Sequence, residues 1–109
     1  MALSGYRLMW MMVLFDLPVM TKKERKAATG FRNFLLDQGF EMAQYSVYLR
    51  FCAGKEQVET YTRRVRDNLP ATGKVHILGF TDRQYETMVC FDGRKREPDR
   101  KSPEQFILF

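Results

Sequence analysis

The sequence is poor in the residues that build metal centres and disulfide scaffolds. Among 109 residues it has two cysteines, Cys52 and Cys90, and one histidine, His76. The cysteines lack any Cys-x-x-Cys or Cys/His spacing, which argues against a zinc site, and no structural disulfide is required. We therefore expect a reduced, cytoplasmic protein. A lone histidine in a strand is usually structural, so His76 is a weak candidate for a general base.

Long apolar runs and nucleotide-binding fingerprints are also missing. The apolar run from Leu8 to Phe15 ends at Asp16 and Pro18, well short of the roughly 20 residues that cross a bilayer. No small-residue cleavage site follows it, so we expect neither a signal peptide nor a membrane-spanning segment. The chain has no phosphate-binding loop motif and no dinucleotide fingerprint, so nucleotide cofactors are not indicated.

What the chain does contain is typical of one basic globular domain. Hydrophobic residues make up 45% and charged residues 28% of the sequence, and the formal net charge is +5. A chain of this length shares a single core. Positive charge attracts polyanions, so nucleic acid is the first partner to consider, although many basic domains bind none.

The order of apolar patterns predicts six main elements. Residues 6–15 form a strand that is apolar on both faces, which is typical of a central strand. Thr21 and Glu24 match a capping box that starts a helix ending near Gly39. Residues 40–51 read as two strands with a bend near Gln44, followed by a second helix that must stop before Pro70. A strand over 74–80 and a short helix from Thr81 to about Met88 follow, with a possible short strand over 89–91. The apolar faces of the two long helices are expected to carry Ala27, Phe31, Phe34 and Leu35 in the first, and Val58, Tyr61, Val65 and Leu69 in the second.

This order predicts an α+β, ferredoxin-like (βαββαβ) fold, an antiparallel sheet with both helices on one face. Residues 1–91 would form this domain, and residues 92–109 a polar linker and a C-terminal edge strand. Helices on one face leave the other face of an apolar strand bare, so we expect a homodimer that covers it. The apolar end, Phe106–Phe109, is predicted to add an edge strand, either to its own sheet or to that of the partner; the alternative is that it simply packs on its own domain.

Asp16 is the candidate catalytic and metal-binding residue, because it is the acidic side chain held at the end of a rigid strand. Mg²⁺ usually takes one or two protein carboxylates together with water and phosphate oxygens, and two-fold symmetry would supply a second Asp16. The alternative is that Asp16 only makes a turn with its own backbone before Pro18.

Basic residues on the two long helices are candidates for nucleic-acid binding through phosphates, although solvated helix faces look the same. The set is Lys22, Lys23, Arg25, Lys26, Arg32, Arg63, Arg64 and Arg66.

Four segments carry a family resemblance: Phe15-Asp16-Leu17-Pro18, the end of the basic helix from Phe34 to Phe40, the block Gln44 to Tyr48, and the stretch from Gly73 to Tyr85. In this order they resemble the small CRISPR-associated adaptation protein that partners the CRISPR integrase, most of all the version found with type II systems. The resemblance spans residues 6 to about 91.

The resemblance implies a ferredoxin-like homodimer whose sheets face each other, with a C-terminal strand that crosses to the partner. It implies that Asp16 binds Mg²⁺ or Mn²⁺ in an endonuclease that acts on RNA or duplex DNA. It also implies a non-catalytic role, in which the dimer bridges integrase subunits and binds duplex DNA. Many members carry Tyr before this Asp, whereas this chain has Phe15.

Two other interpretations stay open. The same topology serves single-strand RNA-binding modules, whose sheet aromatics stack bases, and Tyr45, Tyr48 and Phe51 are candidates for that role. The expected RNA-binding signature is absent, however. The second of these interpretations is a toxin-like ribonuclease of the virulence-associated protein D type, which shares the fold.

Overall fold

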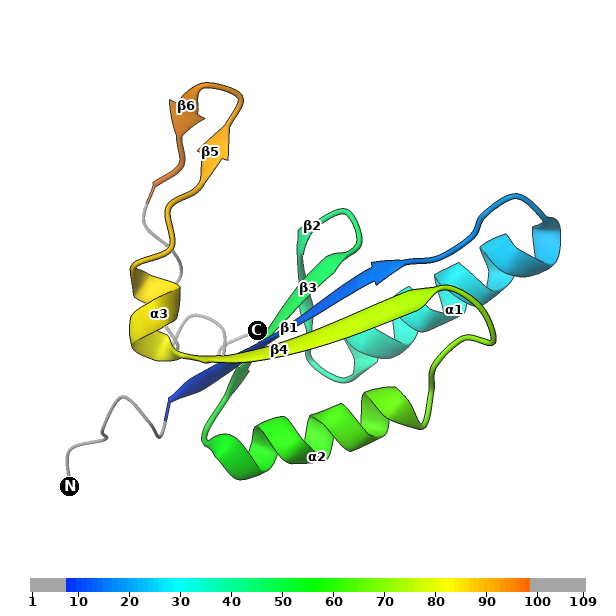
Figure 1. Cartoon of the computed structure of the whole chain (residues 1–109), viewed down its shortest axis with the longest axis horizontal. Helices are drawn as coiled ribbons and strands as arrows, with labels where there is room; N and C mark the ends of the chain where they lie inside the picture. Colours follow the sequence, from blue (N-terminus) through cyan, green and yellow to red (C-terminus); the bar gives the residue numbers. More distant parts are fainter. Residues whose placement is uncertain (1–7, 99–109) are drawn as a thin grey trace.

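The computed structural model describes residues 8–98 of the chain. They form a four-stranded antiparallel sheet in the order β2-β3-β1-β4, with two long helices on one face (Figure 1). This topology confirms the predicted ferredoxin-like fold. In chain order the elements are β1 (Met9–Asp16), α1 (Lys22–Asp37), β2 (Glu41–Gln44), β3 (Val47–Cys52), α2 (Lys55–Arg66), β4 (Lys74–Thr81), α3 (Asp82–Glu86), β5 (Phe91–Asp92) and β6 (Lys95–Arg96).

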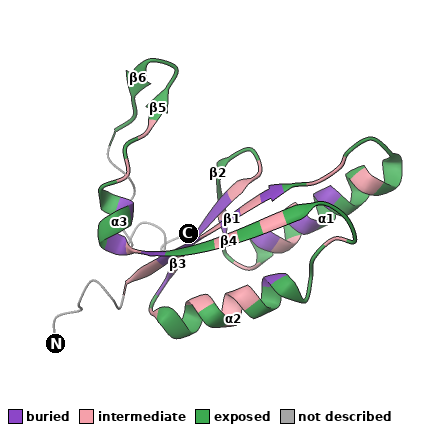
Figure 2. Ribbon diagram, viewed as in Figure 1, coloured by how far each residue is buried: buried purple, intermediate pink, exposed green. Residues whose placement is uncertain are grey.

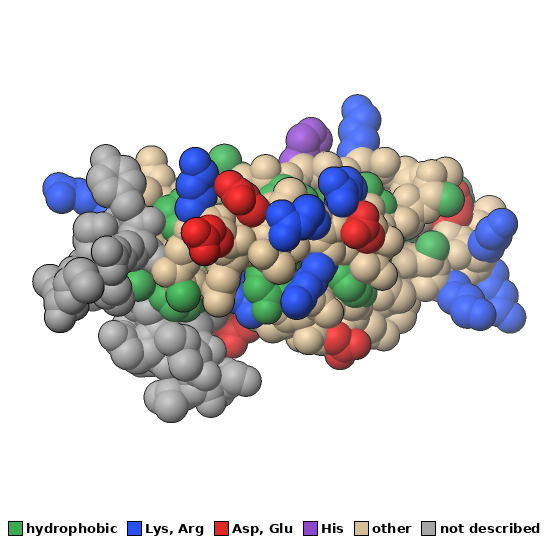
Figure 3. Space-filling model, turned by 90° about the horizontal axis from the view of Figure 1, so that it is seen from below, with side chains coloured by type: hydrophobic (Ala, Val, Ile, Leu, Met, Phe, Trp, Pro, Cys, Tyr) green, Lys and Arg blue, Asp and Glu red, His purple; other side chains and the backbone are tan. Residues whose placement is uncertain are grey.

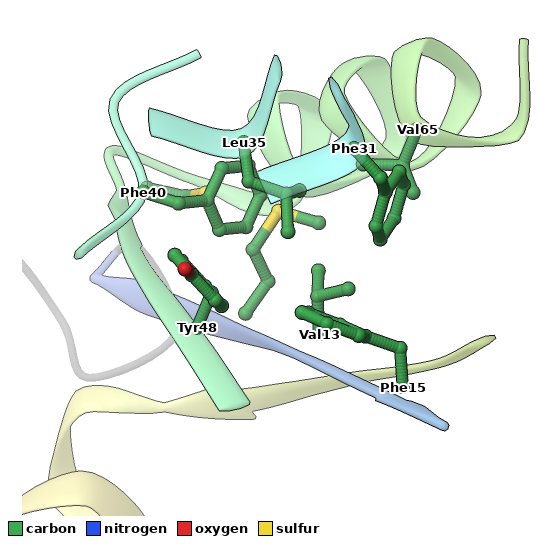
Figure 4. Packing of buried hydrophobic residues seen from close by; sticks show 9 residues of the cluster. Val13, Phe15, Phe31, Leu35, Phe40, Tyr48 and Val65 are labelled. Atoms are coloured by element: carbon green, nitrogen blue, oxygen red, sulfur yellow. The ribbon is translucent and has the colours of Figure 1, made fainter. Parts of the chain in front are cut away.

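The main core lies between the sheet and the two long helices. The odd-numbered residues of β1 point into it, and Val13 and Phe15 meet Phe31 and Leu35 of α1 and Val65 of α2 (Figure 4). Phe15 packs edge-on against Phe31, with 5.2 Å between the ring centroids. Burial of these side chains stabilises the domain by about 1.5–3 kcal/mol each. This face of the sheet is therefore closed within one chain.

Helix α1 begins and ends at the residues that the sequence indicates. Thr21 and Glu24 form the predicted capping box. At the other end Gly39 has a φ of +88°, and the amides of Gly39 and Phe40 donate to the carbonyls of Leu36 and Leu35. This is a Schellman motif, which favours glycine because an L-residue is strained at positive φ.

Two details of the predicted helix faces are wrong. Ala28, rather than Ala27, is the buried alanine of α1, because the core-facing stripe is shifted by one residue. Leu69 is not on a helix, since α2 ends at Arg66, and its side chain is about half exposed. Helix α2 thus ends before Leu69, the residue that directly precedes Pro70, and in that position the α conformation is disfavoured.

Among residues 8–98, only one end of the opposite face of the sheet is covered. There α3, capped by Thr81 and Gln84 as predicted, places Tyr85 on Trp10 with 3.9 Å between the ring centroids. The indole Nε1 of Trp10 donates to the buried Asp82 carboxylate at 2.7 Å. Asp82 is thus a second acidic side chain held rigidly by the fold. No local pattern in the sequence indicates this, and in the structure Asp82 anchors Trp10.

The start of the segment predicted to be a linker is a small hairpin. Strand β5, which overlaps the possible strand at 89–91, pairs with β6 through Phe91–Arg96 and Asp92–Lys95, and both strands are exposed. The hairpin stands away from the four-stranded sheet (Figures 1 and 2). The predicted edge strand at Phe106–Phe109 lies outside the described residues. Within residues 8–98, none of the helices has the length and apolarity needed to cross a membrane.

Candidate active site at the end of strand β1

Asp16 is the last residue of β1, and its side chain is exposed. Neighbouring side chains in a strand point to opposite faces, so Asp16 shares the face of Trp10 and lies opposite the core-facing Phe15. This is the face that α1 and α2 do not cover, and we call it the open face. The Asp16 carboxylate is therefore presented to solvent by a rigid central strand.

Two backbone contacts hold the end of β1 in place. The amide of Phe15 donates to the carbonyl of Ser46 at 3.1 Å, which ties β1 to the turn between β2 and β3. On the other side Gly73, with a φ of +97°, lies so close that a Cβ there would meet the Asp16 carbonyl oxygen at 2.8 Å. Only glycine fits this approach without strain. Gly73 is thus a positioning residue that the sequence analysis did not identify.

The neighbouring edge strand β4 places two polar side chains on the same face as Asp16. Lys74 is directly opposite Asp16 in the antiparallel register, and His76 is opposite Leu14. His76 is thus a diagonal neighbour of Asp16, a position at which side chains lie roughly 7–8 Å apart. Both Lys74 and His76 are exposed. A cation and an imidazole therefore flank the carboxylate, an arrangement suited to binding a phosphodiester.

The described residues of one copy do not bring together a full set of protein ligands for a metal ion. Among residues 8–98, no group of three or more His, Cys, Asp or Glu side chains lies close enough to hold a metal ion. Mg²⁺ and Mn²⁺ favour oxygen ligands, and Mg²⁺ keeps several waters and takes substrate phosphates beside one or two carboxylates. A single exposed Asp16 fits that requirement only with substrate or a second carboxylate.

Phe15 directly precedes Asp16, at the position where the resemblance given above implies a tyrosine in many proteins. Its ring is 7% exposed and stacks on Tyr48, with 5.7 Å between the centroids. Figure 4 shows Phe15 directed into the helix-side core. A side chain at this position lies on the opposite face of the sheet from Asp16. The missing hydroxyl is thus a change within the core.

The predicted phosphate-binding residues are spread over the helix side of the molecule and do not form one site. Lys and Arg side chains alternate there with Asp and Glu, and several gather at the end where α1 begins (Figure 3). The structure places Lys22, Lys23, Arg25 and Lys26 at that end, Arg32 near the middle of α1, and Arg63, Arg64 and Arg66 in the last turn of α2. This surface is across the sheet from the carboxylate of Asp16.

Several of these arginines are engaged in structural contacts. Arg25 donates to the carbonyls of Val19 and Met20, in the loop that follows Asp16. Arg64 donates to the Gln38 side chain at 3.1 Å, and Arg66 pairs with its neighbour Asp67. The exposed Lys22 and Lys23 remain the clearest candidates for phosphate contacts.

The aromatic platform expected of an RNA-binding module is not formed by the three predicted residues. Tyr48 is buried on the helix side, whereas Phe51 packs edge-on against Trp10 on the open face. Tyr45 alone is exposed, in the turn before β3. Tyr48 and Phe51 are three residues apart in β3 and therefore point to opposite faces, so the three candidate rings do not share one stacking surface.

A groove of about 640 Å³ runs along the open face beside the segment that follows α3. Its walls include Met12, Val47 and Leu49 from the sheet, and Met88 and Phe91 from the later segment. Leu78 of β4 lies on the same face and is 53% exposed. The open face is therefore apolar and partly hollowed around the middle of β1.

Comparison with known proteins identifies the family. The family model described as "CRISPR associated protein Cas2" matches residues 9–88, which include the whole four-stranded sheet and α1 to α3. The match therefore extends over the complete ferredoxin-like domain, with Asp16, Lys74 and His76 inside it.

Curated relatives agree over almost the full chain. A protein of Paracidovorax avenae named "CRISPR-associated endoribonuclease Cas2" is 65% identical over 107 residues, which cover 98% of this chain and 99% of the relative. Proteins of the same name from Flavobacterium psychrophilum and Parvibaculum lavamentivorans are 47% and 46% identical, over 98% and 93% of this chain and 93% and 100% of their own lengths. The chain belongs to the CRISPR-associated protein Cas2 family.

Proposed function

We propose that this chain is a metal-dependent endonuclease of the CRISPR adaptation machinery and that Asp16 is its catalytic residue. The observation that carries the proposal is the exposed Asp16 carboxylate, fixed at the end of a central strand on the open face. Relatives that match nearly the whole chain are named endoribonucleases, so RNA is the first substrate to test and duplex DNA the second. Family membership favours this reading over an RNA-binding module or a toxin-like ribonuclease.

The chemistry divides between a bound metal ion and the side chains of the chain. Asp16 would hold Mg²⁺ or Mn²⁺, which supplies charge stabilisation and activates water when bound. Lys74, directly across from Asp16, attracts the substrate phosphate and offsets its charge. His76, on the same face, would exchange a proton with a leaving or attacking oxygen.

We further propose that the working form is a homodimer joined through the open face. Leu78 is largely exposed there, and Met12, Leu14 and Val47 are only partly covered. A monomer rarely leaves such a connected apolar surface in water. Two-fold pairing would cover it and bring a second Asp16 towards the first, which would complete the carboxylate set that one copy lacks. In this proposal Phe106–Phe109 adds its edge strand to the partner.

A bridging role accompanies the nuclease in this proposal. The dimer holds CRISPR integrase subunits and binds duplex DNA through the helix-side basic residues, led by Lys22 and Lys23 at the start of α1. Contacts of this kind neutralise phosphates and are sensitive to salt but not to sequence. We assign the chain to the cytoplasm and to the type II version of the system.

One experiment with Asp16→Asn separates the two roles. The variant keeps the shape of the side chain but loses the charge that a metal ion needs. We expect metal-dependent cleavage of RNA and of duplex DNA to fall to the background rate while duplex binding without metal is unchanged. Asp37→Asn, which removes an exposed carboxylate at the end of α1, is the matched control.

Full cleavage by purified Asp16→Asn protein would remove the catalytic assignment. Loss of duplex binding in the same variant would show that Asp16 belongs to the DNA-binding surface instead. Circular dichroism and solution mass of the variant confirm that the domain and any dimer are intact.

A further inference from the structure

The groove on the open face has an apolar lining that the other described residues leave uncovered. It is lined by β2, by residues of β1 and β3, and by the segment that follows α3. Three of its large apolar side chains are in solvent: Met42 is 58%, Val89 51% and Phe91 61% exposed. Burial of such side chains is favourable. A connected apolar hollow of this kind is typical of a place where another group docks.

The charge and shape of the groove restrict what that group can be. The charged residues in its lining are Glu41 and Glu97, both acidic, and they repel a polyanion such as a nucleic-acid strand. A second copy of the sheet is a broad surface, which does not enter a groove lined by both β2 and the later segment. An extended apolar segment of a few residues does enter one. The occupant that fits is therefore a short apolar stretch of polypeptide.

The chain itself carries such a stretch close to the groove. Glu97 and Pro98, the last described residues, belong to the lining, so the following residues leave from the groove itself. Residues 99–105 are mostly polar, and Phe106–Phe109 are all apolar. The polar stretch spans at most about 25 Å when extended, and Pro103 within it favours a turn. A tether of this length gives a roughly millimolar effective concentration, so even weak docking is populated.

We propose that Phe106–Phe109 dock in the groove of their own chain and cover this part of the open face in a lone copy. The contact needs neither metal nor substrate and is independent of the proposed nuclease. One consequence rests on the proposed homodimer, which forms through the same face. The docked segment must leave the groove before two copies pair, and it can then add its edge strand to the partner. Release of the segment is thereby coupled to self-association.

The test uses the native thiol of Cys90, which is in the groove lining and is not in a disulfide. In the full chain, Ile107→Cys and, separately, Leu108→Cys add a thiol to the apolar segment; the two positions sample both sides of an extended segment. Oxidised glutathione accepts the electrons and protons that the two thiols lose. At about 1 µM protein, far below the effective concentration of the tethered segment, we expect a disulfide within one chain. Non-reducing electrophoresis and mass spectrometry of the linked peptides identify it.

A thiol outside the groove measures random encounter with the same segment. Cys90→Ala combined with Arg96→Cys moves the reporter to the exposed strand β6, which is not in the lining. The bond to Cys90 should form at least about 10-fold faster than the bond to position 96, although position 96 is the more exposed.

Two similarly exposed apolar residues of the open face provide a matched pair of variants. Met42→Asp puts a charge into the groove lining and should slow the bond to Cys90 by about 3-fold to 10-fold. Leu78→Asp puts the same charge on β4, outside the lining, and should leave that rate unchanged.

Three results would overturn the docking. A bond to Cys90 that forms no faster than the bond to position 96 would mean that the segment has no place in the groove. Bonds found only between two chains, at every protein concentration, would assign the segment to the partner. Equal slowing by Met42→Asp and Leu78→Asp would show contact with the open face in general. None of these measurements involves cleavage, so the proposed nuclease is judged separately, through Asp16→Asn.

Discussion

The two faces of the sheet are made by the same strands, yet within residues 8–98 the two long helices cover one face and leave much of the other open. On the helix side, Val13, Phe15 and Leu35 share one continuous core. On the open face, α3 covers Trp10, but further along β1 the surface turns to partly covered Met12 and Leu14 and ends at the exposed Asp16. Figure 2 shows the same contrast on β4, along which exposed and intermediate residues alternate.

The difference separates the face that stabilises the domain from the face that carries the proposed site. Side chains on the helix side have all their partners in the same chain, so that face makes the domain stable. The open face keeps apolar surface and a carboxylate in solvent, which costs stability in a lone copy. Surfaces of this kind are retained where a partner or substrate completes them.

The largest expected effect is the loss of stability in Leu35→Ala, and Leu78→Ala on the other face of the sheet is its comparison. Leu35 is 0% exposed in the helix-side core, so Leu35→Ala should lower the free energy of unfolding by about 2–5 kcal/mol. Leu78 is on the open face, so Leu78→Ala should change it by less than about 0.5 kcal/mol in dilute protein. Urea unfolding at low concentration measures both.

The same pair tests whether a second copy covers the open face. If it does, Leu78→Ala should weaken self-association measured by analytical ultracentrifugation, and its effect on stability should grow with protein concentration. A large, concentration-independent loss in Leu78→Ala would contradict the contrast, because Leu78 would then be part of the core of one chain.

A smaller effect is expected from two glycines that differ in their surroundings. Gly73→Ala should lower the free energy of unfolding by about 1–3 kcal/mol, because its φ is positive and the new Cβ would meet the backbone of Asp16 and Leu17. It should also reduce metal-dependent cleavage, since it displaces Asp16. Gly30→Ala in α1 is the matched control, and it should raise stability by roughly 1 kcal/mol, because no atom lies within 4 Å of its Cβ position.

Chemical denaturation and the cleavage rate are measured on the same preparations. Wild-type cleavage by a Gly73→Ala protein of lowered stability would show that Gly73 supports the fold and has no positioning role at Asp16. Wild-type stability in that variant would contradict the steric argument itself.

The smallest expected effect is a change of stability with pH, caused by the Cys52 thiol in the helix-side core. Burial raises the pKa of the Cys52 thiol above its ordinary value of 9.0, and the charge of nearby Arg50 opposes this with a smaller effect. The unfolded thiol therefore ionises at a lower pH than the folded one. The stability of the fold is unaffected below the ordinary value and decreases as the pH rises towards the folded pKa.

The difference in free energy of unfolding between wild type and Cys52→Ala should accordingly be smaller at about pH 10 than at about pH 7. Urea unfolding at the two pH values measures it, and Cys90→Ala controls for the removal of a thiol in general. A gap that widens with pH would reverse the expected sign and show that Arg50 outweighs burial.

Much of the fold could be read from local signals in the chain. The capping boxes at Thr21 and Thr81 and the glycine at 39 depend only on residues a few positions apart, so α1 and α3 were predicted at their observed starts. The order of the expected strands and helices was enough to give the correct topology. The predictions of the end of α2 and of the strand near β5 were less accurate, because short polar segments carry weak periodicity.

The candidate site was predicted only in part. Asp16 was found because an acidic residue stands out at the end of an apolar strand. Lys74 and His76 were not joined to it, since the register that pairs β4 with β1 depends on a contact between residues far apart in the chain. The arginines of the two helices were grouped by charge, although Arg25 and Arg64 turned out to bind backbone or side-chain groups of the protein.

The sequence by itself determined the order of elements, the basic character of the chain and the carboxylate at position 16, because each follows from residues that are close together. Only the tertiary structure decided which groups meet. It set Lys74 and His76 beside Asp16, pressed Gly73 against the end of β1 and placed Tyr45 under Arg32. The packing of segments that are far apart in the chain controls those distances, so a local sequence pattern does not predict them.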